Sequence, residues 1–148
     1  MKHNESGYTM LEMVAVVIII GLLLTITVPS LEAVFHRLTL EDSAMKMARY
    51  LRYSQQMAVN NQEWYLIHFQ HDHNRYVIRR SGEIIKTVKL PAGIDLGMTN
   101  FSGNELFFYP TGAPSAGGSI PIQNDEDIVF VRVSVGAGRV RVDDNEVE

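Results

Sequence analysis

One acidic side chain, Glu12, lies at the start of an apolar stretch and needs a chemical explanation. No charged residue follows it from Met13 to Leu31. As a helix rising about 1.5 Å per residue, that stretch would reach roughly 28 Å, close to the hydrocarbon thickness of a bilayer, about 30 Å. A carboxylate removed from water in such surroundings needs a partner charge. Glu12 is therefore predicted to pair with a cation when such helices associate, although a helix start would also tolerate an acid.

A second set of candidate groups is His68, His71 and His73 with Asp72. Imidazole and carboxylate are ligands of zinc and other transition metals. A strand end followed by a solvated turn explains the same residues, however, and in an alternating strand His68 faces away from His71. Serine, histidine and aspartate are also present, but no nucleophile-elbow motif organises them for catalysis. We therefore predict no metal, no cofactor and no catalytic residue.

The third set is basic and centres on Arg139 and Arg141. The planar guanidinium group suits phosphate because it makes paired hydrogen bonds. Four other arginines could extend this set: Arg75, Arg79, Arg80 and Arg132. The tail after Arg141 carries four acids, which would repel a polyanion or fold back on the arginines. A solvated face of the last strand explains Arg139 and Arg141 without any ligand, and we favour that interpretation.

Length and composition indicate one small domain attached to an anchor. The chain has 148 residues, a net charge of −4 and no cysteine. The absence of cysteine excludes disulfides and thiolate metal sites. A modest negative charge does not favour polyanion binding by the chain as a whole.

The elements expected to position these groups begin with one long helix from Tyr8 to about Asn61. Pro29 interrupts its hydrogen-bond ladder and Gly21 weakens it, so both positions are predicted to bend or loosen the helix. Apolar residues at three-and-four spacing predict a face that docks on the rest of the protein. They are Leu31, Val34, Phe35, Leu38, Ala44, Met47, Ala48, Leu51 and Ala58.

Beyond Gln62 the pattern changes to short strands separated by turn residues. The predicted strands are Trp64–Gln70, Arg75–Arg80, Glu83–Leu90, Leu106–Tyr109, Ser119–Gln123, Ile128–Val135 and Arg139–Val142. In Ile128–Val135 the alternating valines, Val135 included, are predicted to share a buried face. The fold class is predicted to be α+β. We divide the chain into a leader (1–7), a membrane-spanning helix (8–29), an amphipathic continuation (30–62) and a globular β domain (63–148).

The first residues show a short polar leader that ends in Gly7-Tyr8-Thr9-Met10-Leu11-Glu12. An ordinary secretory signal would have a more basic leader and a small-x-small cleavage site after the apolar core, and neither is present. The arrangement instead resembles the class III signal of type IV pilins and pseudopilins. That resemblance implies cleavage between Gly7 and Tyr8 by the prepilin peptidase, which then methylates the amine of Tyr8. It also implies that Glu12 meets the Tyr8 amine of an adjacent subunit.

Later segments resemble the GspH/FimT group of minor pseudopilins in particular. They are Met47–Ala58 with Asn60-Asn61, Phe108-Tyr109-Pro110-Thr111-Gly112 with Gly117-Gly118-Ser119-Ile120, and Val135 with Gly138-Arg139-Val140-Arg141. The resemblance implies a pilin-like fold, with a long N-terminal helix packed on an antiparallel β domain. It also implies kinks at Gly21 and Pro29, which match positions where pilin helices bend or melt on assembly.

By this resemblance the chain is a minor pseudopilin, a structural subunit of a type II secretion pseudopilus or a type IV pilus, and not an enzyme. Its expected partners are the prepilin peptidase, other major and minor pseudopilins, and the cytoplasmic membrane. The globular domain is expected on the extracytoplasmic, periplasmic side. The alternative is a minor pilin that binds DNA during uptake, because in the FimT branch the segment matching Gly138-Arg139-Val140-Arg141 is associated with DNA.

Overall fold

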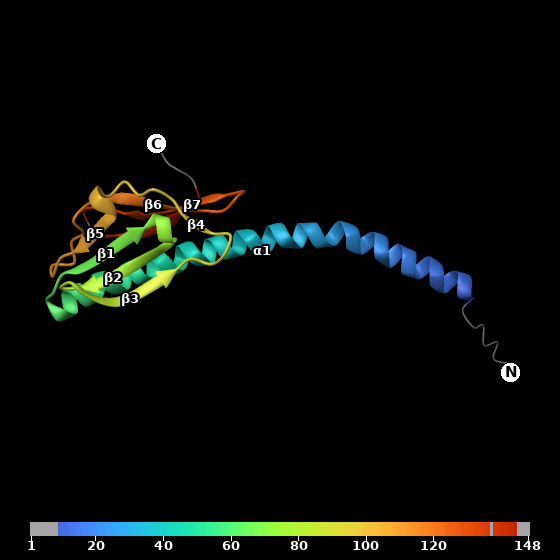
Figure 1. Cartoon of the computed structure of the whole chain (residues 1–148), viewed down its shortest axis with the longest axis horizontal. Helices are drawn as coiled ribbons and strands as arrows, with labels where there is room; N and C mark the ends of the chain where they lie inside the picture. Colours follow the sequence, from blue (N-terminus) through green and yellow to red (C-terminus); the bar gives the residue numbers. More distant parts are fainter. Residues whose placement is uncertain (1–8, 137, 145–148) are drawn as a thin grey trace. The chain divides into compact units, whose positions relative to one another are not determined.

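The computed structural model describes residues 9–136 and 138–144, except for the side chains of residues 26–33. Within those residues, helix α1 (Met10–Asn61) precedes eight strands and two short 3-10 helices (Figure 1). The contacts between Cα atoms divide the chain into two compact units, Met1–Phe35 and His36–Glu148. The α+β class predicted from the sequence is confirmed.

In the second unit, α1 buries one face against the rest of the domain. Leu40, Ala44, Met47, Ala48 and Leu51 are at most 1% exposed. Their spacing of three or four residues places them on one side of a helix. The alanines let the strands approach the helix backbone, while each fully buried leucine or methionine contributes about 2 kcal/mol. This part of the predicted docking face is confirmed.

The upstream part of the predicted docking face is wrong at Leu38, which lies in the second unit and is 54% exposed. Val34 and Phe35, in the first unit, are 54% and 63% exposed. The buried face begins at Leu40, which the predicted set left out. Leu31 lies among the residues whose side chains are not described. Spacing alone could not separate a buried apolar face from an exposed one.

The C-terminus of α1 is closed by the residues that follow it. Gln62 adopts a left-handed conformation with φ of 55°, which ends the helix after Asn61. The side-chain amide of Gln62 donates a hydrogen bond to the carbonyl of Val59 at 2.7 Å. The side-chain amide of Asn61 donates to the hydroxyl of Tyr65 at 2.8 Å. These contacts satisfy helix-end groups and lead the chain into the first strand.

The first sheet has four antiparallel strands in the order β3-β2-β1-β5. Its strands are β1 (Tyr65–Gln70), β2 (Arg75–Arg80), β3 (Glu83–Lys89) and β5 (Glu105–Phe108). The 3-10 helix η1 (His71–His73) joins β1 to β2, and Ser81 and Gly82, both with positive φ, turn β2 into β3. Strand β3 lies at the edge of the sheet and is exposed at every residue except Val88.

The second sheet has four antiparallel strands in the order β4-β6-β7-β8. Its strands are β4 (Asp95–Leu96), β6 (Gly118–Gln123), β7 (Ile128–Val133) and β8 (Val140–Asp143). The 3-10 helix η2 (Ser102–Asn104) lies before β5. Edge strand β8 is tied to α1, because Arg52 Nη2 donates a hydrogen bond to the carbonyl of Val140 at 2.8 Å.

One hydrophobic core joins α1 to both sheets. Phe69 and Phe108 of the first sheet and Ile120 and Val131 of the second are at most 1% exposed, and they belong to the same cluster as the buried face of α1. Phe101, just before η2, stacks on Phe69 with ring centroids 5.9 Å apart. Every member of this cluster lies between Leu40 and Val140, in the second unit.

The observed strands follow the predicted ones within one or two residues, with two differences. The sequence did not predict β4, which has only two residues and depends on pairing with β6 and on a hydrogen bond from the backbone of Leu96 to the side chain of Asn74. Strand β7 ends at Val133, and Val135 is 62% exposed. The prediction that Val135 shares the buried face was therefore wrong.

Candidate functional site

The N-terminus of α1 is capped by Thr9. The Thr9 hydroxyl accepts a hydrogen bond from the backbone N–H of Glu12 at 3.3 Å, and the Thr9 carbonyl accepts from the same N–H at 3.1 Å. Threonine at the cap with glutamate three residues later is the sequence pattern of a capping box. Glu12 is exposed and lies in the first turn of α1. The helix dipole stabilises its negative carboxylate at that position.

Gly7 and Tyr8, the residues at the predicted cleavage and methylation point, lie outside the described residues. The predicted cut after Gly7 would make Tyr8 the first residue, four positions before Glu12 in the sequence. Pairing of the Tyr8 amine with Glu12 of another subunit stays a prediction.

The apolar stretch after Glu12 is exposed wherever its side chains are described. Every described side chain from Met10 to Thr25 is exposed, and Val17, Leu22 and Leu23 are each at least 60% exposed. A helix that is apolar all round is normally buried in a membrane or in the core of an assembly. Among the residues that the structure describes, no helix is long and apolar enough to cross a membrane. The membrane span over 8–29 stays a prediction.

The predicted bends at Gly21 and Pro29 also stay predictions. The structure assigns α1 as helix through both residues. No atom lies within 4 Å of a Cβ placed on Gly21, so a close approach by a described residue does not explain this glycine. Nearby, Thr25 donates a hydrogen bond from its hydroxyl to the carbonyl of Leu22 at 2.7 Å, a contact that often accompanies local bending.

The six arginines of the predicted basic set do not form one patch. Arg75, Arg79 and Arg80 belong to β2 in the first sheet, whereas Arg132 and Arg141 face each other across β7 and β8 in the second. Arg80 is paired with Glu63 and Glu83, at 3.4 and 3.8 Å. The predicted extension to Arg75, Arg79 and Arg80 is therefore wrong, whereas Arg132 lies beside Arg141 as predicted.

Arg139, just before β8, and Arg141, within β8, are both exposed. Among the described residues, neither forms an ion pair. Asp143 of the acidic tail pairs with Arg132 at 3.4 Å, so the predicted folding back of the tail is confirmed for one arginine of the basic set. Asp144 instead pairs with Arg37 at 3.9 Å, and Glu146 and Glu148 lie outside the described residues.

The histidines near the end of β1 lie at a turn. His71, Asp72 and His73 form η1, and His71 Nδ1 lies 3.4 Å from the carbonyl of Leu96. His68 lies within β1, opposite Val77 of β2 and Glu105 of β5. Among the described residues, no group of three or more histidine, cysteine, aspartate or glutamate side chains is placed to hold a metal ion.

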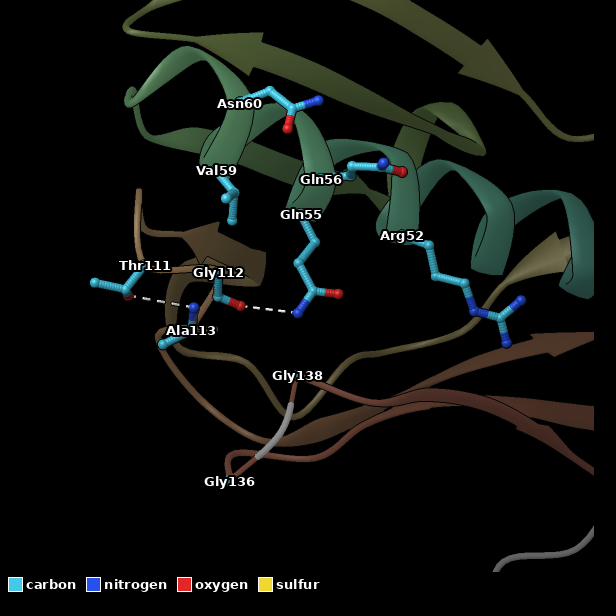
Figure 2. Close-up of a pocket in the computed structure, with 10 residues that line it drawn as sticks. All are labelled: Arg52, Gln55, Gln56, Val59, Asn60, Thr111, Gly112, Ala113, Gly136 and Gly138. Carbon is cyan, nitrogen blue, oxygen red and sulfur yellow. Dashed lines mark hydrogen bonds between the residues drawn. The ribbon is translucent and has the colours of Figure 1, made fainter.

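A cavity of about 720 Å³ lies between the end of α1 and the loops before β6 and β8 (Figure 2). Gln55 points into it from α1, and its amide donates a hydrogen bond to the carbonyl of Gly112 at 2.8 Å. A Cβ on Gly138 would overlap Gln55 Nε2, and Gly112 and Gly138 both have positive φ. Gln55 thus contacts both motif glycines. Gly138 requires glycine because of its φ and the Gln55 amide, and Gly112 because of its φ and Val59 Cγ2, which lies 3.0 Å from a Cβ placed there.

The cavity has hydrogen-bonding groups but no means of acid–base chemistry among the described residues that line it. Arg52, Gln56, Asn60 and Thr111 supply a guanidinium, two amides and a hydroxyl, and no carboxylate, imidazole or thiol is among the ten lining residues. The roles of Arg52 and Gln55 were missed by the sequence, since their partners lie 88 and 57 residues away. In the sequence, only the motif glycines Gly112 and Gly138 pointed to this contact between α1 and the loops before β6 and β8.

Two independent comparisons bear on what this chain is. Residues 2–28 match the model of the prokaryotic N-terminal methylation motif. The fold is similar to the minor pseudopilin EpsH of the Vibrio cholerae type 2 secretion system, with a TM-score of 0.59 and 14% identity over 70% of this chain and 94% of that one. The chain has the N-terminal motif of prepilin-like proteins and a fold similar to those of pilins and pseudopilins. The resemblance predicted from the sequence is thereby confirmed.

Two further relatives of this pilin-like protein come from pilus and competence systems. The type IV minor pilin FimU of Pseudomonas aeruginosa is 17% identical, with a TM-score of 0.60, over 72% of this chain and 90% of that one. The competence protein ComGD of Bacillus subtilis is 24% identical over 95% of each chain. The structural likenesses establish the fold, and the matched motif implies a protein that is anchored in a membrane and assembles with other pilins.

Proposed function

We propose that this chain is a minor structural subunit of a pilus or pseudopilus, cut between Gly7 and Tyr8 and held in the assembly by its apolar helix. The observation that carries the proposal is the exposure of every described side chain from Met10 to Thr25. Burying several such helices together removes apolar surface from water or exchanges lipid contacts for helix contacts. The methylation motif over residues 2–28 supports the same role.

In this proposal Glu12 supplies the one charge pair of the apolar bundle. Its carboxylate meets the Tyr8 amine of a neighbouring subunit, and that pairing compensates for the loss of water around it. Before assembly the apolar segment lies in the cytoplasmic membrane, with Glu12 near the interface, where an acid costs less than at the bilayer centre. The second unit, from His36 onward, then lies on the extracytoplasmic side.

The test is to replace Glu12 with alanine in cells that make the filament. Cleavage should remain largely intact, whereas the amount of subunit in sheared filaments should fall at least about tenfold, because an unpaired Tyr8 amine stays buried. Glu12→Gln, which keeps the size of the side chain, should behave like Glu12→Ala. Normal incorporation of both variants would contradict the charge-pair mechanism.

A bulky residue in place of Gly7 should instead leave the uncut precursor, visible by mass spectrometry.

A second candidate function is DNA binding during uptake. The likeness to a competence protein over 95% of each chain favours it, and so does the exposure of Arg139 and Arg141 without ion pairs among the described residues. Binding to phosphates should weaken steeply as salt rises. Retention of duplex DNA at low salt, lost in Arg139→Ala/Arg141→Ala, would favour this function. Absence of binding at low salt would reject it.

A further inference from the structure

One surface of the second unit combines cations with aromatic rings. Lys46, Arg49, Tyr50 and Tyr53 line a hollow of about 380 Å³ on α1. Their spacing of three, four and seven residues places them on one helix face. Tyr53 is 47% exposed, whereas Tyr50 is half-buried and packs edge-on against Tyr76, with ring centroids 6.1 Å apart. The hollow therefore has a fixed aromatic floor and exposed cations on its rim.

The charges around this hollow are not balanced within the described chain. Arg49 contacts Asp42 at 3.5 Å, but both side chains are well exposed, and such pairs contribute little. Among the described residues Lys46 has no ion pair. The hollow is thus suited to an acidic ligand.

The same molecule also has an acidic turn whose negative charge is complementary to the positive hollow. Between β6 and β7 the chain turns through Asn124, Asp125, Glu126 and Asp127, and all three acids are exposed. The side-chain oxygen of Asn124 accepts hydrogen bonds from the N–H groups of Glu126 and Asp127, at 3.0 and 2.6 Å. The turn is therefore preorganised, which lowers the entropy lost on docking. Among the described residues, Asp125 and Glu126 form no ion pair.

The positions of the acidic turn and the hollow fit a staggered contact between two copies. Asp127 lines a cavity together with Arg37 and Leu40, so the acidic turn lies level with that part of α1. The centre of the hollow is about ten residues further along the helix, which corresponds to roughly 15 Å. A second copy displaced by about that distance along α1 would bring its turn beside the hollow of the first.

We propose that the acidic turn of one copy, residues 124–127, docks in the hollow of a second copy formed by Lys46, Arg49, Tyr50 and Tyr53. Asp125 and Glu126 pair with Lys46 and Arg49, and the backbone of the turn packs on Tyr53. Because the turn and the hollow are different surfaces, the contact is heterologous and can repeat along an open assembly. This inference rests on the filament role proposed above and adds the surfaces that set the stagger.

The absence of cysteine allows a direct test with full-length chains. Two differently tagged copies, Tyr53→Cys and Glu126→Cys, are made in the same cells and oxidised in the membrane. We expect a disulfide-linked heterodimer. The matched control uses Glu83→Cys in place of Glu126→Cys. Glu83 is an exposed acid at the start of β3, outside the acidic turn, and its cysteine variant should give little disulfide-linked product. Equal linkage by Glu126→Cys and Glu83→Cys would overturn the proposal.

Charge exchange tests whether electrostatics orient the contact. Lys46→Glu in the copy with Tyr53→Cys should lower linkage about two- to fivefold, the range for exposed pairs, and Asp125→Lys in the other copy should restore it. Failure of the exchange to restore linkage would overturn the pairing. Linkage of Tyr53→Cys to a different protein instead of the second copy would overturn the choice of occupant. The choice of occupant would also be overturned if no heterodimer formed and the protein instead bound single-stranded DNA in a way that Lys46→Glu abolished.

This experiment separates the inference from the function on which it rests. Subunits that reach sheared filaments normally but give no heterodimer would reject the staggered contact alone. Subunits absent from the filaments, with Gly7 cleavage intact, would instead reject the filament role.

Discussion

Gly138 shows how one residue can hold two parts of the fold together. It precedes β8 at the point where the loop passes Gln55 of α1, and its φ of 56° lies in the left-handed region. A Cβ there would overlap the Gln55 amide and would lie in tight contact with the carbonyl of Gly112, at 3.1 Å. Gly136, two residues earlier, has open space around it and no such restriction.

We therefore expect Gly138→Ala to destabilise the protein by about 1–3 kcal/mol, because both the backbone conformation and the Gln55 contact are disturbed. Gly136→Ala, in the same loop, should change stability by less than about 0.5 kcal/mol. Urea unfolding followed by circular dichroism would measure both. Equal stability of the two variants would contradict the account of Gly138.

Tyr76 gives the fold a dependence on alkaline pH. Burial raises the pKa of Tyr76 above its ordinary value, and the neighbouring Tyr50 acts in the same direction. Because the folded-state pKa is the higher one, the stability contributed by neutral Tyr76 is present below the ordinary pKa of about 10 and is lost as pH rises above it. Tyr76→Phe should move the alkaline unfolding midpoint upward. Tyr109→Phe, which alters a tyrosine that is 47% exposed, should leave that midpoint unchanged in the same titration.

At the scale of elements, the start of α1 depends on Thr9. Thr9→Val removes the hydroxyl that accepts from Glu12 N–H while keeping the size of the side chain. The loss of a cap costs about 1 kcal/mol, so amide hydrogen exchange in the first turn of α1 should become roughly fivefold faster. Thr25→Val, which removes a hydroxyl that donates to a helix carbonyl, should leave that turn unchanged. The measurement uses the full chain in detergent micelles.

Which elements form was largely predictable from local pattern. Turn residues such as Ser81-Gly82 marked strand ends, and the alternation in Ile128–Val133 marked a half-buried strand. The sequence could not show where the docked face of α1 begins, because Val34, Phe35 and Leu38 are as apolar as the buried residues after them. It also missed β4, since two residues carry no period, and their pairing depends on a distant strand.

At the scale of the whole molecule, the core cluster lies entirely within His36–Glu148. We expect a fragment of residues 36–148 to fold alone, with one cooperative thermal transition at about 45–65 °C. A fragment of residues 49–148 should not, because it lacks Leu40, Ala44 and Met47, which are fully buried in that core. Scanning calorimetry would distinguish them. A 36–148 fragment without a cooperative transition would show that the first unit contributes to stability.

The candidate sites were predictable only where a motif is local. Gly7, Tyr8 and Glu12 fall within one short segment, so spacing alone pointed to them, and their roles in cleavage and pairing stay predictions. The tie between Arg52 and β8 and the pairing of Asp144 with Arg37 join distant parts of the chain. Such contacts depend on how the strands and α1 come together, which the spacing of residue types does not encode.

The exposed edge strand β3 has a consequence for how the protein could misassemble. Ile84 and Ile85, 56% and 42% exposed, lie on a strand whose outer edge pairs with no strand in the part of the chain that the structure describes. Such an edge can template amyloid-like stacking when copies are concentrated, and charged lysines are a common safeguard against it. Lys86 and Lys89 interrupt the apolar run, since like charges repel when two β3 edges approach. Replacing both lysines with apolar residues is therefore expected to favour β3-to-β3 association when copies are concentrated.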